Sequence, residues 1–319
     1  MSKCIGSIHR STEMMAFLIL IMASFGVRSA VITVNSSQDT GPGTLREAVS
    51  LANSGDTINF AAGVQIITLQ SQIKIDKGVT IAGPGANLLT ISGNKSTRMI
   101  WVETPSPVTI SGITFDSGFD RDYGGALINW GGSNLNIYRC VFQNNRTTWH
   151  SGAILNYYSS LTVDQSAFIG NYAPTSGSAV LSWNADQYRV TNSTFFNNQG
   201  AIFGDAGGWI GNNTFVGNHS SNGGAIFNSS ALNFKLKGNL FSGNSSLGGS
   251  RLPCTSLGHN IFDDDSGCAW SDASDRNATN VGLDPAGLKL NGAQTPTVAL
   301  VEGSPAIDAI PTWSCNLAD

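Results

Sequence analysis

The sequence predicts an all-β fold: a single-stranded parallel β-helix of about ten coils, closed at its N-terminal end by a short helix. Three observations favour it: a recurring phenylalanine, alternating apolar residues before each phenylalanine, and a small-Ala-apolar motif between successive phenylalanines. The phenylalanines recur every 20 to 27 residues, as Phe115, Phe142, Phe168, Phe195, Phe215, Phe241 and Phe262. Such self-similarity is typical of a solenoid, in which each unit buries its apolar face against its neighbours.

Each repeat contains the signals of two or three short strands. Before the phenylalanine, copies such as VTISGITF and LTVDQSAF alternate with period two and are rich in Val and Ile, which favours strands. The small-Ala-apolar motif, as in Gly125-Ala126-Leu127 and Gly152-Ala153-Ile154, predicts a tight turn into another inward strand. Residues at equal phase should then lie about 4.8 Å apart in successive coils.

The first 29 residues differ from the rest. Lys3 and Arg10 precede an apolar run from Met14 to Phe25, and small residues flank a cleavage point after Ser29. This pattern predicts a secretory signal sequence over residues 1–29, the alternative being an uncleaved membrane-anchoring helix. After removal of the signal, no transmembrane span is expected.

Residues 30–107 are expected to form the N-terminal cap and the opening coils. A capping box starts at Thr44, and an apolar stripe at helical spacing predicts a helix over residues 44–53. Alternating apolar residues predict five strands, at 56–60, 65–69, 73–75, 79–81 and 89–91. Residues 108–262 then form the regular coils, and residues 263–319 the C-terminal coils.

Composition is consistent with one elongated, monomeric domain. The 319 residues include 37 glycines, 12% are charged and 41% are hydrophobic, which is too apolar for disorder and too rich in turns for a helical bundle. A net charge of −4 without a basic stripe argues against nucleic acid as a partner.

Cysteine usage fits an exported protein. Cys254 and Cys268 bracket a loop rich in Gly and Asp, so a disulfide between them is expected, with free thiols as the alternative. Cys140 is expected to be a buried stacking residue, and its pairing and that of Cys315 stay open. No metal site is expected, because the chain has no CxxC motif or paired histidines.

Three segments resemble known families. GTLREAVSLANSGDTINF, at 43–60, resembles the CSLREA opening of exported bacterial β-helix proteins, and the F-x-x-N and G-G-A-I copies are similar to polymorphic outer-membrane protein repeats. Residues 258–260, 291–297 and 303–309 resemble the choice-of-anchor Q domain. These resemblances imply a right-handed β-helix of the pectin-lyase-like superfamily that is secreted or tethered to the cell surface, including the outer membrane. They imply no reaction. For residues 263–319, a truncated anchor region and a freely secreted chain both stay open.

One aromatic column is the candidate ligand-binding site. Trp130, Tyr157 and Trp183 each follow the repeat alanine by four residues, so they should form a ladder on which sugar rings could stack. The preceding Asn129, Asn156 and Ser182 are then expected to bind sugar hydroxyls. An ordinary structural stack is the alternative.

Long loops at 116–123, 143–151 and 169–176 share one phase and are expected to lie beside that column. They carry further aromatic side chains, and Trp149 joins the candidate ligand-binding residues. The sequence therefore favours a noncatalytic, adhesin-like protein that presents an elongated surface to a polysaccharide or a cell-surface glycan.

The alternative function is a polysaccharide lyase or glycoside hydrolase acting on an acidic polysaccharide. Its candidate catalytic residues are Asp116, Asp120, Arg121, Asp122 and His150. Calcium would be a cofactor only for the lyase, and no cofactor is expected otherwise. Three of these residues lie in one short loop, so turn formation is the competing explanation of the acidic cluster.

A second column is expected to be structural. Asn145, Asn171, Asn198, Asn218 and Asn244 each follow a repeat phenylalanine by three residues. Amides at one phase can hydrogen bond to each other along a stack and to the backbone of the turns. The sequence therefore predicts a buried amide ladder.

Overall fold

The structure is a computed structural model of the chain. It describes residues 29–175, 177–185, 187–205, 207–220, 224–229, 234–246, 254–263, 270, 272–278 and 280–311. The predicted signal sequence, apart from Ser29, lies outside the described residues. Cys268 and Cys315 also lie outside them.

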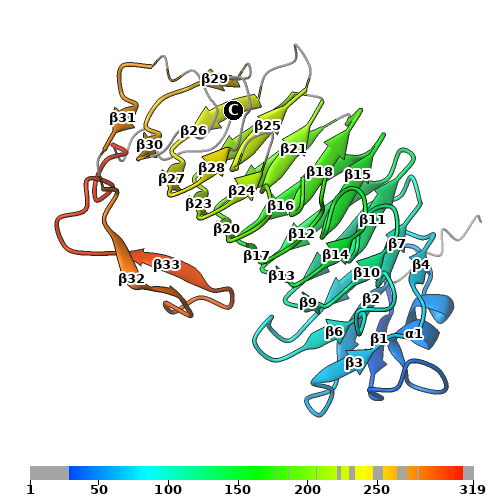
Figure 1. The fold of residues 1–319 in the computed structure, drawn as a ribbon. Helices are drawn as coiled ribbons and strands as arrows, with labels where there is room; N and C mark the ends of the chain where they lie inside the picture. Colours follow the sequence, from blue (N-terminus) through cyan, green and yellow to red (C-terminus); the bar gives the residue numbers. More distant parts are fainter. Residues whose placement is uncertain are drawn as a thin grey trace, which may run out of the picture.

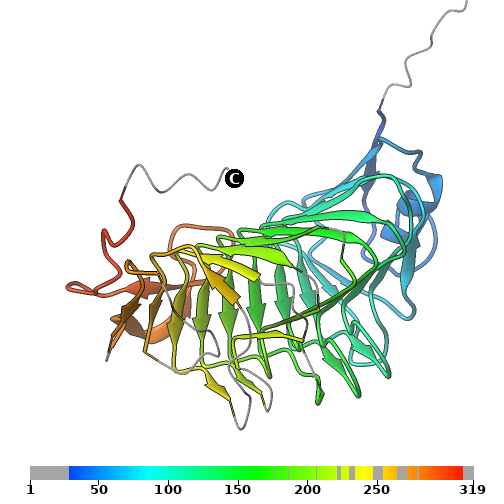
Figure 2. The same ribbon diagram turned by 90° about the horizontal axis from the view of Figure 1, so that it is seen from above.

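The chain winds into a parallel β-solenoid of about eight turns with one short helix near its N-terminal end (Figure 1). Viewed from above, its strands stack along one axis like rungs (Figure 2). The predicted all-β solenoid with an N-terminal capping helix is therefore confirmed. Within the described residues, three long parallel sheets, here named A, B and C, run along this axis.

From β2 to β25, each coil contributes one strand in turn to sheets A, B and C, whereas the described strands of these three sheets before and after these coils belong to sheets A and B only. Sheet A contains β1 (Val31–Val34), β2 (Thr57–Phe60), β5 (Thr80–Ala82), β8 (Val108–Ser111), β12 (Asn134–Tyr138), β16 (Ser160–Asp164), β19 (Tyr188–Thr191), β22 (Gly208–Gly211), β26 (Phe234–Lys237) and β29 (Cys254–Ser256). Sheet B contains β3 (Ile66–Thr68), β6 (Thr90–Ser92), β9 (Thr114–Asp116), β13 (Val141–Gln143), β17 (Ala167–Ile169), β20 (Thr194–Phe196), β23 (Thr214–Val216), β27 (Leu240–Ser242), β30 (Ile261–Phe262) and β31 (Arg276–Asn277). Sheet C contains β4 (Ile73–Ile75), β7 (Ile100–Val102), β11 (Leu127–Trp130), β15 (Ile154–Tyr157), β18 (Val180–Trp183), β21 (Ile202–Gly204) and β25 (Ile226–Asn228).

Three smaller pairings complete the described strands. Two of them are parallel and lie in the loops: β10 (Phe119–Asp120) with β14 (Arg146–Thr147), and β24 (His219–Ser220) with β28 (Ser245–Ser246). The third joins β32 (Leu283–Lys289) and β33 (Thr297–Leu300) as an antiparallel hairpin beside the solenoid rather than as a further coil (Figure 1). The Thr295 hydroxyl, in the turn between β32 and β33, donates to the Gln165 carbonyl at 3.1 Å. This turn therefore contacts the solenoid.

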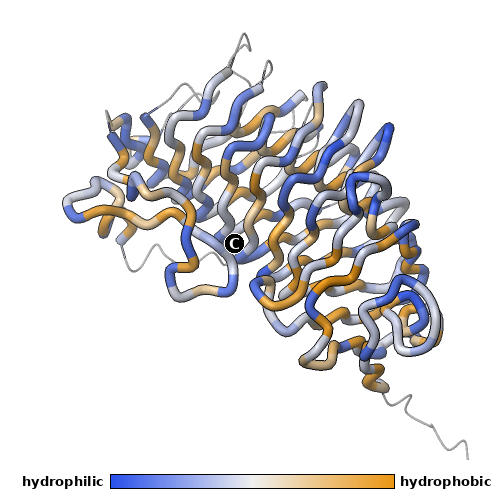
Figure 3. The backbone as a smooth tube through the Cα atoms, turned by 60° about the horizontal axis from the view of Figure 1, so that its bottom comes forward, coloured by the Kyte–Doolittle hydropathy of each residue, from blue (hydrophilic) through white to orange (hydrophobic). Residues whose placement is uncertain are grey.

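The strands pair so that residues at the same position of successive repeats are direct neighbours. Phe115, Phe142 and Phe168 are direct neighbours in sheet B, and the column continues through Phe195, Phe215, Phe241 and Phe262. From Phe115 to Phe241, ring centroids of neighbouring coils are 4.8 to 5.1 Å apart. Apolar side chains thus fill the interior in columns, and polar and apolar segments alternate along the backbone (Figure 3).

The predicted amide ladder is present at the turn after sheet B. Each asparagine side chain donates to the side-chain oxygen of its equivalent in the next coil, at 2.8 to 3.0 Å between Asn145 and Asn244. The same nitrogen also donates to a phenylalanine carbonyl of the preceding coil, as from Asn171 to Phe142. All five asparagines are buried. The ladder therefore satisfies backbone groups that the turn would otherwise leave unpaired.

A second polar ladder runs at the phase of Cys140. The backbone N–H of Cys140 donates to the Ser166 hydroxyl, and that of Ser166 donates to the Ser193 hydroxyl. Asn213, Asn239 and Asn260 continue the column. Cys140 is fully buried, as expected, and the structure shows it as a free thiol. Cys254 is disulfide-bonded to a residue outside the described ones, so its pairing with Cys268 stays a prediction.

The capping helix α1 spans Leu45–Leu51 and covers the first coil. Thr44 is its N-cap and accepts a hydrogen bond from the backbone N–H of Glu47. The Glu47 carboxylate accepts from the N–H of Gly43, one residue before the N-cap. Leu45, Ala48 and Val49 are buried, as the helical spacing predicts.

Candidate functional site

Sheet C has buried apolar side chains on both of its faces. Leu127, Ile154 and Val180 point into the core. Their successors Ile128, Leu155 and Leu181 lie in a separate cluster on the outer face and are at most 2% exposed. The sequence signal for this outer cluster is a pair of adjacent apolar residues in each strand, as in LINW, ILNY and VLSW. Sequence analysis did not use that signal.

The aromatic ladder lies beside this outer cluster. Trp130, Tyr157 and Trp183 are direct neighbours in the register of sheet C, as the repeats predict. Trp130 and Tyr157 stack, with ring centroids 4.3 Å apart. The ring of Trp183 packs edge-on against His150 at 5.0 Å and Tyr123 at 6.1 Å. The column is therefore a stacked pair followed by a ring that belongs to a second group.

A pocket of about 260 Å³ is lined by rings from both groups, the stacked pair and the group of Trp183. Its apolar lining consists of Leu155 and four aromatic residues: Tyr123, Trp130, Tyr157 and Trp183. Its polar lining is Asn184 and Asp205, which follow strands β18 and β21. One carboxylate oxygen of Asp205 accepts from the Asn184 backbone N–H at 2.7 Å. The pocket thus combines aromatic walls with an ordered carboxylate.

The prediction that Asn129, Asn156 and Ser182 bind sugar hydroxyls is wrong. All three are at most 1% exposed and form a chain of hydrogen bonds on the inner side of sheet C. Successive residues of a strand point to opposite faces, so the residue before an outward aromatic side chain points inward. Asn184 and Asp205 hold the polar positions instead. Sequence analysis missed both, although Asn184 directly follows Trp183.

One buried arginine holds the loop that supplies Tyr123. The Arg98 guanidinium donates to the carbonyls of Tyr123 and Gly124, at 2.8 and 2.9 Å, and forms an ion pair with Asp120 at 2.8 Å. Burial lowers the pKa of Arg98, and the carboxylate of Asp120 opposes this effect. Arg98 is thus a positioning residue for one wall of the pocket, and sequence analysis did not single it out.

The five candidate catalytic residues do not form one constellation. The Asp120 carboxylate pairs with Arg98 and also accepts from two backbone N–H groups of its own turn. Asp116 accepts from the Asn144 side chain at 3.1 Å, on the outer face of sheet B. Arg121 and Asp122 are exposed in the loop, and their carbonyls bind the Thr148 hydroxyl and the His150 N–H.

His150 is the candidate that contacts the pocket wall. Its ring stacks on Tyr123, with centroids 5.8 Å apart, and its Nδ1 lies 2.7 Å from the Thr175 hydroxyl. Burial lowers its pKa. Trp149 packs on His150 and Tyr123 but does not line the pocket, and it is 48% exposed. Within the described ranges, no group of three or more His, Cys, Asp or Glu residues could hold a metal ion.

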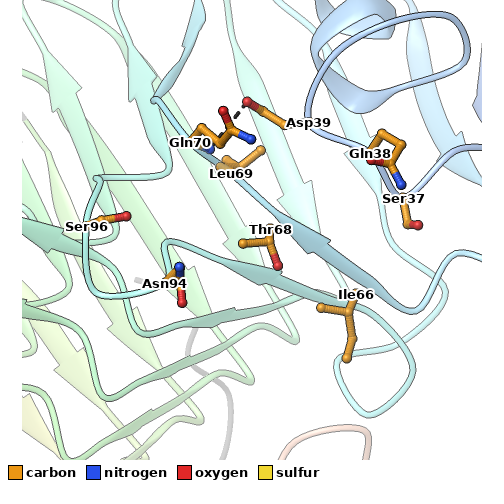
Figure 4. Close-up of a pocket in the computed structure, with 9 residues that line it drawn as sticks. All are labelled: Ser37, Gln38, Asp39, Ile66, Thr68, Leu69, Gln70, Asn94 and Ser96. Atoms are coloured by element: carbon orange, nitrogen blue, oxygen red, sulfur yellow. Dashed lines mark hydrogen bonds between the residues drawn. The ribbon is translucent and has the colours of Figure 1, made fainter.

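A second, polar hollow of about 480 Å³ lies at the N-terminal end (Figure 4). It has no aromatic lining residue, and its carboxylate, Asp39, is engaged by Arg46 at 2.6 Å and by the Gln70 N–H. Arg46 also binds the carbonyls of Ser71 and Gln72, which joins α1 to the first coil. Asp39 therefore has a structural role in the N-terminal cap, as the partner of Arg46.

Parallel sheets wound about one axis, with columns of like residues inside, define the class of parallel β-solenoids. Residues 47–241 match the family described as the right handed beta helix region. This match covers more than half of the chain, and the protein belongs to that family. No curated protein matches the chain. In the part of the chain that the structure describes, no helix is long and apolar enough to span a membrane.

Proposed function

We propose that the protein is an exported, noncatalytic β-helix that binds glycans, as an adhesin-like molecule secreted or held at the cell surface. The observation that carries this proposal is the pocket lined by Trp130, Tyr157 and Trp183. The ordered Asp205 carboxylate stands at the same pocket.

Sugars suit this combination of groups. The C–H faces of a sugar ring are apolar and pack on aromatic faces, while its hydroxyls need acceptors such as the carboxylate of Asp205. A pocket of about 260 Å³ is small for a ligand site, which favours one ring of a chain over a large compact ligand. Because Leu155 is held in a rigid sheet, the binding geometry needs little rearrangement.

Export is supported by different observations. A basic start followed by an apolar run precedes the first described residue, and Cys254 is disulfide-bonded. Structural disulfides persist mainly in oxidising compartments. The resemblance to exported β-helix proteins of the pectin-lyase-like superfamily, and to the choice-of-anchor Q domain, points the same way. The lyase or hydrolase alternative has less support, because the five candidate catalytic residues do not form one constellation and the Asp120 carboxylate is engaged by Arg98.

The proposal is tested by retention of the mature protein on columns of immobilised neutral and acidic polysaccharides. We expect retention on at least one of them, and its loss in the variant carrying both Trp130→Ala and Trp183→Ala. Trp209→Ala, on the outer face of sheet A, is the matched control and should be retained. Absence of retention on every column, or equal loss in both variants, contradicts binding at this pocket. Reducing or unsaturated products after incubation contradict the noncatalytic role.

A further inference from the structure

A further pocket, distinct from the aromatic pocket and from the hollow at the N-terminal end, lies at the start of the loops that carry Tyr123 and His150. Phe119, Arg146 and Tyr172 are neighbours in register on three successive coils, through the short pairing of β10 with β14 and one further bridge. They line a pocket of about 430 Å³, together with Lys95 and Asn144. Sequence analysis placed these loops on one face with the aromatic ladder, but the structure separates Phe119 from Tyr123 into two different pockets.

The exposed Arg146 side chain packs on an aromatic ring in this pocket. The Arg146 guanidinium carbon lies 4.3 Å from the centroid of the Tyr172 ring. When the flat face of a guanidinium packs on an aromatic ring, the N–H donors at its edge stay available. Two parallel N–H groups at this edge match the two oxygens of a carboxylate or a sulfate. The stacking also limits the rotamer freedom that Arg146 would lose on binding a ligand.

The pocket has a positive character. Lys95 and Arg146 line it, and no acidic residue does. Among the residues that the structure describes, neither Lys95 nor Arg146 takes part in an ion pair. Asp116 is the acid next to the pocket, through the Asn144 side chain. The chain as a whole is acidic, with a net charge of −4, whereas this pocket contains two cations and no acid.

We propose that this pocket binds the oxyanion of an acidic saccharide, with Arg146 and Lys95 on a carboxylate or sulfate ester and Phe119 against the sugar ring. Phe119 is half-buried and offers the apolar surface that a free inorganic anion would not need. The Asn144 side-chain nitrogen donates to Asp116, and its side-chain oxygen is an acceptor that a sugar hydroxyl can use. The site does not depend on the pocket at Trp183, so either can exist without the other.

The test compares charged and neutral polymers of the same backbone. The probes are dextran sulfate with dextran, and polygalacturonate with its methyl ester, titrated into the mature protein at low and at physiological salt. We expect binding of at least one charged probe and a loss of about tenfold in its affinity in Arg146→Gln, because one charge-assisted pair is removed. Lys95→Gln should give a smaller loss, because its ammonium lacks the planar fork. Which charged probe binds tells sulfate from carboxylate.

Arg139→Gln is the matched control, because it removes the same charge from an exposed side chain that binds Gln165 outside both pockets. It should bind the charged probe within about twofold of the unaltered protein. Equal losses in Arg146→Gln and Arg139→Gln overturn the proposal in favour of nonspecific attraction, and so does absence of binding to both charged probes. Trp130→Ala with Trp183→Ala should leave charged-probe binding at this pocket intact, which separates the two sites.

Discussion

The guanidinium of Arg98 lies 2.8 Å from the carboxylate of Asp120, and this ion pair joins two neighbouring coils. Both side chains are shielded, with exposed fractions of 8% and 27%. The same guanidinium binds the carbonyl of Tyr123, whose ring is a wall of the aromatic pocket. A carboxylate that sequence analysis considered for catalysis thus positions a candidate binding loop.

Replacing Arg98 by Met should destabilise the protein and weaken the proposed sugar binding together. The change removes the ion pair of Asp120, which keeps the two N–H donors of its own turn, and it removes the guanidinium donor of the Tyr123 and Gly124 carbonyls. The loss should cost about 2–4 kcal/mol. The expected result is a lower urea midpoint of unfolding and a larger Kd for any neutral sugar bound at the aromatic pocket. Arg139→Met is the control and should change neither quantity measurably. An unchanged midpoint for Arg98→Met would show that the ion pair has no structural role.

Replacing Asn171 by Leu should lower the free energy of unfolding by about 1–3 kcal/mol. The Asn171 amide donates to the Phe142 carbonyl at 2.9 Å and accepts from the backbone and the side chain of Asn145. Leucine leaves these buried groups unpaired. Asn134→Leu, at an exposed strand position, is the control. Equal unfolding midpoints for the two variants, measured by circular dichroism in urea, would contradict a stabilising ladder.

The solenoid could be predicted from the sequence because its packing repeats with the sequence. Residues at equal phase lie on each other, so the columns of Phe142 and Asn171 follow from counting positions. The same counting gives the register of Trp130 with Tyr157 and Trp183. It also predicts the wrong environment for Asn156, because the direction of a side chain depends on strand alternation and not on phase.

The rest of the site depends on contacts that do not repeat. In the other described coils no arginine stands at the position of Arg98, and its partners Asp120 and Tyr123 lie in an irregular loop. Asp205 reaches the pocket from the coil after Trp183, next to the turn residue Asn184. Such contacts arise from loop conformation, which periodicity does not encode.

The Cys140 thiol should not react in the folded protein. Burial raises its pKa to about 12, so almost none is thiolate at neutral pH. We expect no alkylation by iodoacetamide of the peptide containing Cys140 under native conditions, and complete alkylation in urea, measured by mass spectrometry. Cys140→Ser serves as the control, because Ser166 and Ser193 occupy the same phase. Native alkylation at the rate of a free thiol would contradict the packing around this column.

Stability should decrease with falling pH partly through His150. Burial lowers its pKa below the ordinary value of about 6.5, so the unfolded chain binds the proton at a higher pH than the folded protein does. The stability contribution of neutral His150 is therefore complete above about pH 6.5 and is lost as the pH falls through the lowered pKa.

We expect the thermal midpoint to fall between about pH 7 and pH 5, and to fall less in His150→Phe, which keeps a ring against Tyr123 and Trp183. His219→Phe, at an exposed position, is the control and should keep the dependence of the unaltered protein. An identical decrease in His150→Phe and the unaltered protein would show that His150 does not contribute to the pH dependence of stability.

In the proposed glycan site, the Asp205 carboxylate should contribute to sugar affinity without contributing to stability. In Asp205→Asn the side-chain oxygen can still accept from the Asn184 N–H, so the turn is kept. The charge that strengthens hydrogen bonds from sugar hydroxyls is lost, which should raise the Kd about tenfold at an unchanged thermal midpoint. Asp76→Asn removes the same charge from an exposed position outside this pocket and should leave the Kd unchanged. Titration calorimetry with the oligosaccharide of the retained polymer measures both variants, and equal affinities for the two would leave the aromatic rings as the recognition elements and exclude Asp205 from ligand contact.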